Sequence, residues 1–146
     1  MKLCRFVKPV PAMLTANTVP LPEVPPPEYA PMTWDDLRRC ESGGMTFGPH
    51  SVTHPVLSRT TDDQSRSELA DGWRRLRAEA ANPVPVFCYP NGQPSDFGTR
   101  EMDTLISLGF IGAVVGEHGY AEGTRFRNDR YQPFQVHRFS YPENLA

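Results

Sequence analysis

The sequence predicts an α/β fold in which helices cover a parallel sheet. Helical patterns and short apolar runs alternate along the chain in the order helix, strand, helix, strand, helix, strand. Glycine, proline or asparagine bounds these segments, and 146 residues with 38% hydrophobic content are enough for one domain with a single core. Alternation of this kind is typical of parallel strands joined by helices, with functional groups at the carboxyl ends of the strands.

Proline divides the chain into two regions. Half of the 16 prolines fall within the first 31 residues, and proline offers no backbone N–H to a helix or a central strand. We therefore expect residues 1–28 to form a poorly ordered or extended arm and residues 29–146 to form the folded domain.

The first predicted helix covers residues 33–42. Thr33 and Asp36 have the spacing of a capping box with an acidic third residue, and apolar residues recur at helical spacing until two glycines end the segment. A short alternating run at 45–47 then predicts a strand that delivers His50 at its carboxyl end.

The second predicted helix has the clearest pattern. Thr61 caps it, and Asn82 followed by a proline ends it. Its apolar face consists of Leu69, Trp73, Leu76 and Ala80. The run 84–89 is rich in β-forming residues and predicts a buried strand that leads into a Pro-Asn-Gly turn.

The last part of the chain predicts one more helix and up to two strands. The helix begins near Thr99 and has Gly109 as its C-cap. Its apolar side consists of Met102, Leu105, Ile106 and Leu108. A buried strand is expected at 110–115, a loop at 116–130 and a last strand at 134–141.

Charge and cysteine content exclude several classes of protein. The formal charge is −2, with 15 basic and 17 acidic side chains mixed along the chain, so we expect no nucleic-acid partner. Cys4, Cys40 and Cys88 are too widely spaced for a disulfide framework or a cysteine zinc site and are interpreted as reduced thiols. No apolar run is long enough for a signal peptide or membrane span, which predicts a cytoplasmic protein.

Two histidines form the strongest chemical signal. His50 and His54 lie four residues apart at a predicted strand end, where a turn would aim both imidazoles at one point and suit zinc or another divalent first-row metal. Position 51 is Ser51 rather than glutamate, which excludes the helical HExxH arrangement. On spacing alone, surface or capping histidines explain the pair as well.

The order of motifs resembles the polysaccharide deacetylase family, carbohydrate esterase family 4. GMTFGPHSVTHPVLS resembles its second motif, and PVPVFCYPNGQPSDF resembles its third motif in the F-x-Y-P-x-G form. LISLGFIGAVVG and QPFQVHRFSYP resemble segments that follow, so that the resemblance spans roughly residues 29–142. It implies that the parallel sheet is an incomplete (β/α) barrel-like sheet.

The resemblance also implies roles for individual residues. His50 and His54 would bind a divalent metal, usually zinc, and would hold it weakly because two ligands are fewer than a catalytic zinc site requires. The backbone N–H of Asn91 would stabilise the oxyanion, and Tyr89 and Pro90 would contact the substrate. A plain strand-ending turn explains residues 89–92 equally well.

The chain departs from the family at the first motif, F-D-D-G, which is absent. Asp35 and Asp36 imitate its paired aspartates but are interpreted as charges at a helix N-terminus. The arginine that is frequent in the third motif is replaced by Cys88. His137 is interpreted as a half-buried strand residue and His118 as a loop residue.

Three functions remain open from the sequence. The first is a metal-dependent hydrolase that removes acetyl groups from amino sugars or polysaccharides, impaired or inactive as this chain. The second is a non-catalytic carbohydrate-binding or interaction module, and the third is a small metal-binding α/β protein unrelated to carbohydrate. The expected partner is a polysaccharide or amino-sugar oligomer. A missing N-terminal segment or a partner chain would cover the open edge of the sheet.

Overall fold

The computed structural model describes residues 26, 29–121 and 129–139. The chain divides into two units, residues 1–32 and residues 33–146. Apart from residue 26, the predicted arm over 1–28 lies outside the described residues, as does Cys4. No helix in the described ranges is long and apolar enough to cross a membrane.

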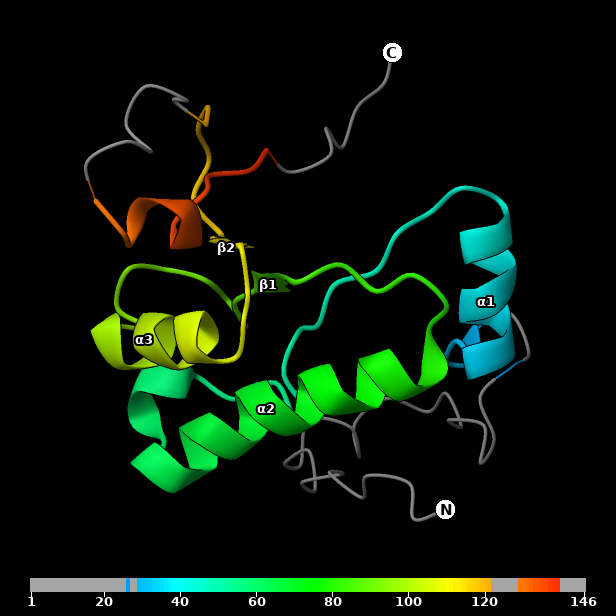
Figure 1. Cartoon of the computed structure of the whole chain (residues 1–146), viewed down its shortest axis with the longest axis horizontal. Coiled ribbons are helices and arrows are strands. Elements are labelled where there is room, and N and C mark those ends of the chain that lie inside the picture. The colour runs from blue at the N-terminus through cyan, green and yellow to red at the C-terminus, as the bar shows by residue number, and fades with distance from the viewer. Residues whose placement is uncertain (1–25, 27–28, 122–128, 140–146) are drawn as a thin grey trace, which may run out of the picture. The chain divides into compact units, whose positions relative to one another are not determined.

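The described residues of the second unit form three α-helices and two short strands (Figure 1). In chain order, with the two short 3-10 helices, they are α1 (Trp34–Ser42), η3 (Leu57–Arg59), α2 (Asp62–Glu79), β1 (Val86–Cys88), α3 (Thr99–Ser107), β2 (Gly112–Val114) and η5 (Gln132–Phe134). The three predicted helices are therefore confirmed.

The helix ends follow the capping signals in the sequence. The Thr33 hydroxyl accepts a hydrogen bond from the Asp36 N–H at 3.1 Å, which with the reciprocal bond from the Thr33 N–H to Asp36 completes the capping box of α1. At α2 the Thr61 hydroxyl accepts a single hydrogen bond from the Gln64 N–H at 3.3 Å. Gly109, just beyond α3, has a φ of +82°, a conformation that glycine adopts without steric cost.

The strands β1 and β2 pair in parallel, with Val86 opposite Gly112 and Cys88 opposite Val114. The helix α3 connects them, and α2 and α3 lie together on one side of the strands while η5 packs against β2 (Figure 1). The α/β class and the parallel pairing are thus confirmed. Only two strands pair in the described part of the chain, so a barrel-like sheet is not confirmed.

Two predicted strands do not form as regular strands. Residues 45–47 are extended but belong to no strand. Only two backbone bonds, from the Val84 N–H to Phe47 and from the Cys88 N–H to Pro49, join the 47–49 segment to the β1 region, at 2.9 and 3.1 Å. Pro49 and Pro85 have no N–H to donate, which prevents a continuous ladder.

The predicted strand at 134–141 is wrong in its described part. The chain forms η5 and then makes a single parallel bridge between Val136 and Val114. Pro133, at the start of η5, favours a helical turn and lacks a donor for a sheet. Residues 140–141 lie outside the described residues.

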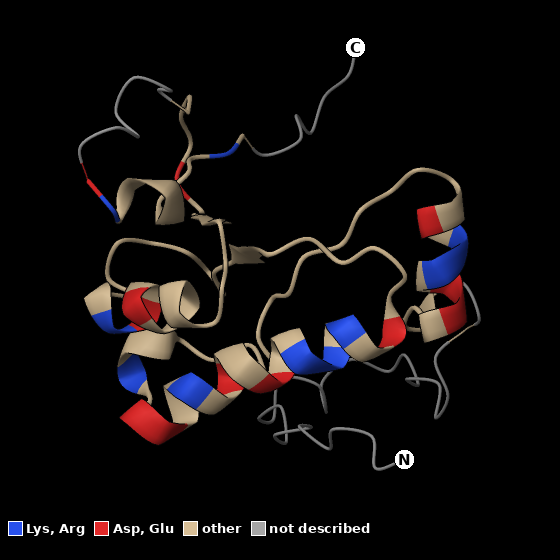
Figure 2. Ribbon diagram, in the orientation of Figure 1, with Lys and Arg blue, Asp and Glu red and all other residues tan. Residues whose placement is uncertain are grey.

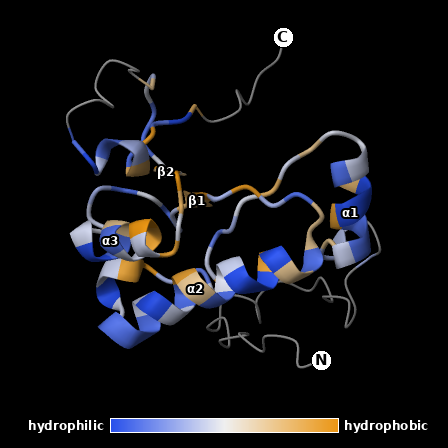
Figure 3. Cartoon of the chain, viewed as in Figure 1, coloured by the Kyte–Doolittle hydropathy of each residue, from blue (hydrophilic) through white to orange (hydrophobic). Residues whose placement is uncertain are grey.

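The core lies between the strands and the helices α2 and α3. Its buried members are Leu57, Leu69, Phe87, Tyr89, Phe97, Met102, Leu105, Phe110, Ala113, Val115 and Phe134. The strands are among the most hydrophobic segments, whereas α2 alternates in hydropathy (Figure 3). Ile106, predicted on the apolar side of α3, is 37% exposed, because it lies about 100° around the helix from Leu105.

Acidic and basic side chains alternate along α1 and α2 (Figure 2). Several of them form ion pairs three residues apart, as in Arg38 with Asp35 and Arg74 with Asp71. Exposed pairs of this kind contribute little to stability. Cys40 and Cys88 are free thiols, in agreement with the sequence.

Candidate functional site

The two predicted ligand histidines come together in a tight turn. The ring centroids of His50 and His54 are 4.8 Å apart, with an angle of 75° between the ring planes. Ser51 and His54 both have positive φ, 63° and 59°, and the His54 N–H donates to the Ser51 hydroxyl at 3.1 Å. The left-handed conformation at these two positions bends the chain, and the two imidazoles lie side by side.

The side chain of Glu68 holds this turn from α2. Its Oε2 accepts hydrogen bonds from the N–H groups of Val52 and Thr53 at 2.7 and 2.8 Å, and its Oε1 accepts the Thr53 hydroxyl at 2.6 Å. Glu68 is only 7% exposed. Sequence reasoning missed this residue, because it lies about 100° around the helix from Leu69 and a single glutamate at that position gives no local sign of burial.

Gly72, one helical turn further along α2, lets the same turn approach the helix. A Cβ at this position would lie 3.2 Å from the carbonyl carbon and oxygen of Ser51. Glu68 and Gly72 therefore give α2 a surface that fits the 51–54 segment.

The orientation of His50 is set by β1. Its Nδ1 lies 2.7 Å from the carbonyl oxygen of Cys88. Because a carbonyl oxygen only accepts, Nδ1 carries the proton in this bond, and in the neutral imidazole Nε2 then has the free lone pair. This is the arrangement expected of a metal-ligating imidazole.

The turn after β1 uses two left-handed residues, Asn91 with φ of 59° and Gly92 with φ of 76°. Asn91 is exposed, and its N–H has no acceptor among the described residues. The Gly92 carbonyl accepts the Gly116 N–H at 2.8 Å. A Cβ on Gly92 would lie 2.5 Å from the Gly116 nitrogen, and one on Gly116 would lie 2.2 Å from the Asn91 oxygen.

The structure buries Tyr89 and Pro90, the two predicted substrate contacts. The Tyr89 ring stacks on Phe97 at a centroid distance of 3.8 Å and an angle of 7°. Its hydroxyl has no hydrogen-bond partner in the described part of the chain. Burial raises the pKa of Tyr89 above its usual range, and the negative charge of Glu101 adds to this. Contact with substrate stays a prediction for both residues.

The acidic residues of α1 act as the sequence predicted. The Thr33 hydroxyl, together with its N–H and the nearby Arg39, lowers the pKa of Asp36, and Asp35 pairs with Arg38 at 2.6 Å. Across the described ranges no group of three or more His, Cys, Asp or Glu side chains is placed to hold a metal. The imidazole pair is a donor set that suits zinc and would supply two of the usual three protein ligands.

The two remaining histidines lie in the segments after β2. His137 follows the Val136 bridge and is exposed rather than half-buried, with its ring against Gly119. His118 lies in the loop after β2, as predicted, with its ring 6.4 Å from that of Phe139. The loop prediction for 122–128 falls outside the described residues.

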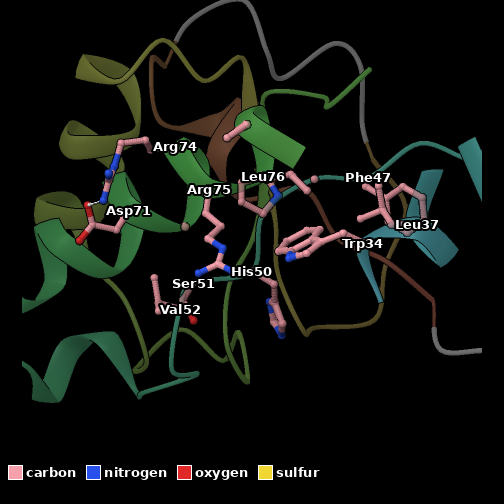
Figure 4. A pocket seen from close by; sticks show the side chains of 14 residues that line it. Trp34, Leu37, Phe47, His50, Ser51, Val52, Asp71, Arg74, Arg75 and Leu76 are labelled. Carbon is pink, nitrogen blue, oxygen red and sulfur yellow. Dashed lines mark hydrogen bonds and ion pairs between the residues drawn. The ribbon is translucent and has the colours of Figure 1, made fainter. Parts of the chain in front are cut away.

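A pocket of about 740 Å³ opens beside His50, between α1, α2 and the 47–52 segment. Figure 4 shows Arg75 reaching from α2 toward Trp34 and the turn at Ser51. The Arg75 guanidinium carbon is 5.6 Å from the centre of the Trp34 ring. Such a pocket is within the size range of small-molecule and cofactor sites.

The fold and the site together define an α/β protein with an imidazole pair in the turn that follows the 47–49 segment. The sequence profile of the polysaccharide deacetylase family matches residues 10–106. The chain belongs to the polysaccharide deacetylase family.

One solved structure supports the fold. The Streptococcus pyogenes deacetylase PplD in complex with acetate is similar with a TM-score of 0.68 and 19% sequence identity. The similarity covers 82% of this chain and 49% of PplD, so the chain spans about half the length of that structure. No curated protein matches the chain significantly.

Proposed function

We propose that this chain carries part of a metal-dependent hydrolase site of the deacetylase type, which removes acetyl groups from amino sugars or polysaccharides. The observation that carries the proposal is the pair of imidazoles 4.8 Å apart, with the His50 proton directed to Cys88 and its Nε2 left as a donor. Membership of the polysaccharide deacetylase family and a fold shared with a deacetylase solved with acetate support the reaction class.

In this proposal His50 and His54 hold a divalent cation, usually zinc. Such a cation would polarise the acetyl carbonyl and make bound water more acidic. Asn91 is an exposed residue whose N–H has no acceptor among the described residues, and this N–H would donate to the developing oxyanion. The pocket beside His50 would hold the sugar.

We further propose that the activity of this chain by itself is low and that its metal is weakly held. The 146 residues contain no F-D-D-G sequence, and Asp35 and Asp36 are engaged in the capping and ion pairs of α1. General base catalysis contributes about 10²–10⁴-fold, so a site without its carboxylate should be slower than an intact one by at least that factor.

Release of acetate from acetylated chito-oligosaccharides tests this proposal. The purified chain should release acetate no faster than its His50→Ala variant in buffer with zinc or cobalt, while calorimetry should detect metal binding that the variant loses. A robust metal-dependent rate that His50→Ala abolishes would contradict the impaired site. Absence of metal binding to the unmodified chain would contradict the metal site itself.

The pocket favours a second candidate function, a non-catalytic carbohydrate-binding module. Trp34 offers an aromatic face in a cavity of about 740 Å³, and aromatic side chains supply much of the contact area at binding surfaces. Binding of chito-oligosaccharides that persists in EDTA and is lost in Trp34→Ala would support this function over the hydrolase.

A further inference from the structure

We propose that Glu68 is a positioning residue of the metal site, which holds the 51–54 turn so that the two imidazoles face one point before any metal binds. The proposal rests on the function proposed for His50 and His54. In this proposal a residue of α2, outside the histidine motif, determines the orientation of His50 and His54.

The carboxylate of Glu68 makes three hydrogen bonds to this turn and none elsewhere in the described chain. Two come from consecutive backbone N–H groups, of Val52 and Thr53, and one from the Thr53 hydroxyl, all between 2.6 and 2.8 Å. No Lys or Arg of the described residues pairs with Glu68. Its buried charge is therefore stabilised by the donors of the turn, and hydrogen bonds to a carboxylate are stronger than those between neutral groups.

The two residues that Glu68 binds lie between the two strained positions. Ser51 and His54 have φ of 63° and 59°, values that residues with a Cβ rarely adopt. A turn with two such residues needs support from its surroundings. Glu68 supplies that support at Val52 and Thr53, and it thereby fixes the directions in which the flanking imidazoles leave the chain.

The geometry distinguishes the effects of two substitutions. In Glu68→Gln the amide oxygen still accepts the two N–H groups, and the amide nitrogen can donate to the Thr53 hydroxyl, because a hydroxyl oxygen also accepts. In Glu68→Ala two backbone N–H groups lose their acceptor. Glu68→Gln should therefore keep the turn and Glu68→Ala should release it.

Glu101 provides a matched control. It is also a buried glutamate on a core helix, and it accepts the Ser65 hydroxyl at 2.7 Å and the Gly98 N–H at 2.8 Å. No hydrogen bond joins it to the 50–54 turn. Glu101→Gln should therefore disturb the core without moving the imidazoles.

The experiment measures the affinity for Co²⁺ and Zn²⁺ by calorimetry and the imidazole nitrogen resonances of the metal-free chain by NMR. Glu68→Ala should weaken metal binding about 10- to 100-fold, as removal of outer-shell support does, and should shift the resonances of His50 and His54. Glu68→Gln should keep most of the metal affinity of the unmodified chain. Glu101→Gln should bind metal within about twofold of the unmodified chain.

Several outcomes would overturn the proposal. A folded Glu68→Ala variant with unchanged metal affinity and unchanged imidazole resonances contradicts it. If Glu68→Ala does not fold, Thr53→Val removes one of the three bonds, and unchanged resonances of His50 and His54 in that variant also contradict the proposal. If the unmodified chain binds no metal, the proposed function fails, and the NMR comparison of metal-free chains still tests the positioning role.

Discussion

The Nδ1 of His50 lies 2.7 Å from the carbonyl oxygen of Cys88, so that one hydrogen bond joins the histidine turn to β1 across 38 positions of sequence. The thiol of the same cysteine lies 3.4 Å from Nη1 of Arg138. Burial raises the pKa of the Cys88 thiol, and the positive charge of Arg138 opposes that increase. Cys88 thus contacts both the candidate site and the segment after β2.

The raised pKa of Cys88 predicts slow alkylation. The thiolate is the reactive form, and a higher pKa leaves less thiolate at any given pH. In a mass-spectrometric time course with iodoacetamide, the pH of half-maximal rate at Cys88 should be higher in the folded chain than in urea. Arg138→Ala should raise it further. A lower half-maximal pH in that variant would contradict the role of the guanidinium.

Substitutions at Asn91 should separate its backbone from its side chain. Asn91→Gly keeps the N–H and tolerates the φ of 59°, so its stability and any acetate release should stay unchanged. Asn91→Ala should lose about 1–2 kcal/mol, because a Cβ without a local hydrogen bond disfavours this conformation. Urea unfolding measures the difference. A strong loss of activity in a stable Asn91→Gly variant would assign the role to the amide side chain.

Tyr89→Phe should leave the free energy of unfolding unchanged or raise it by up to about 1 kcal/mol. The substitution removes a buried hydroxyl that has no partner in the described part of the chain and keeps the ring stacked on Phe97. Phe97→Ala, by contrast, should lose about 3–5 kcal/mol. A large destabilisation in Tyr89→Phe would show that the hydroxyl is bonded. A change confined to oligosaccharide binding would support substrate contact.

Gly72→Ala should affect the site more than the fold. Alanine is favoured over glycine in a helix by about 1 kcal/mol, but its Cβ would lie 3.2 Å from Ser51 and require the turn to shift. We therefore expect little net change in urea stability and weaker metal binding. The prediction would be contradicted if Gly72→Ala were more stable by about 1 kcal/mol and had unchanged metal affinity. The turn at Ser51 would then adjust to the added Cβ without affecting the histidine pair.

The helices could be predicted from the sequence because their signals are local. The capping box of α1 and the threonine cap of α2 lie within four residues of each helix start, and both are present in the structure. The strands were harder, since their extent depends on distant partners. The segment at 45–47 has the right alternation, but Pro49 just after it and Pro85 in the neighbouring run lack the donors that a ladder requires.

For the candidate site too, the features with local signals could be predicted from the sequence, and the contacts between distant residues could not. The closeness of His50 and His54 followed from their spacing, whereas the role of Asn91 was inferred from its motif and stays a prediction. Glu68 was not, because its partner Thr53 lies 15 residues away and the contact depends on how α2 packs. The Arg138 contact with Cys88 spans 50 residues and likewise has no local signal.

The interlocked backbones of Gly92 and Gly116 limit how this family member can vary. Each glycine lies where a side chain would collide with the opposite loop, so neither position can accept another residue unless both loops separate. A library that randomises the two loops should therefore recover glycine at both positions among folded members, whereas the exposed side chain of Gln93 remains free to diversify. Altered recognition is then most easily selected at Gln93, because the backbone at the two glycines can change only if both loops change together.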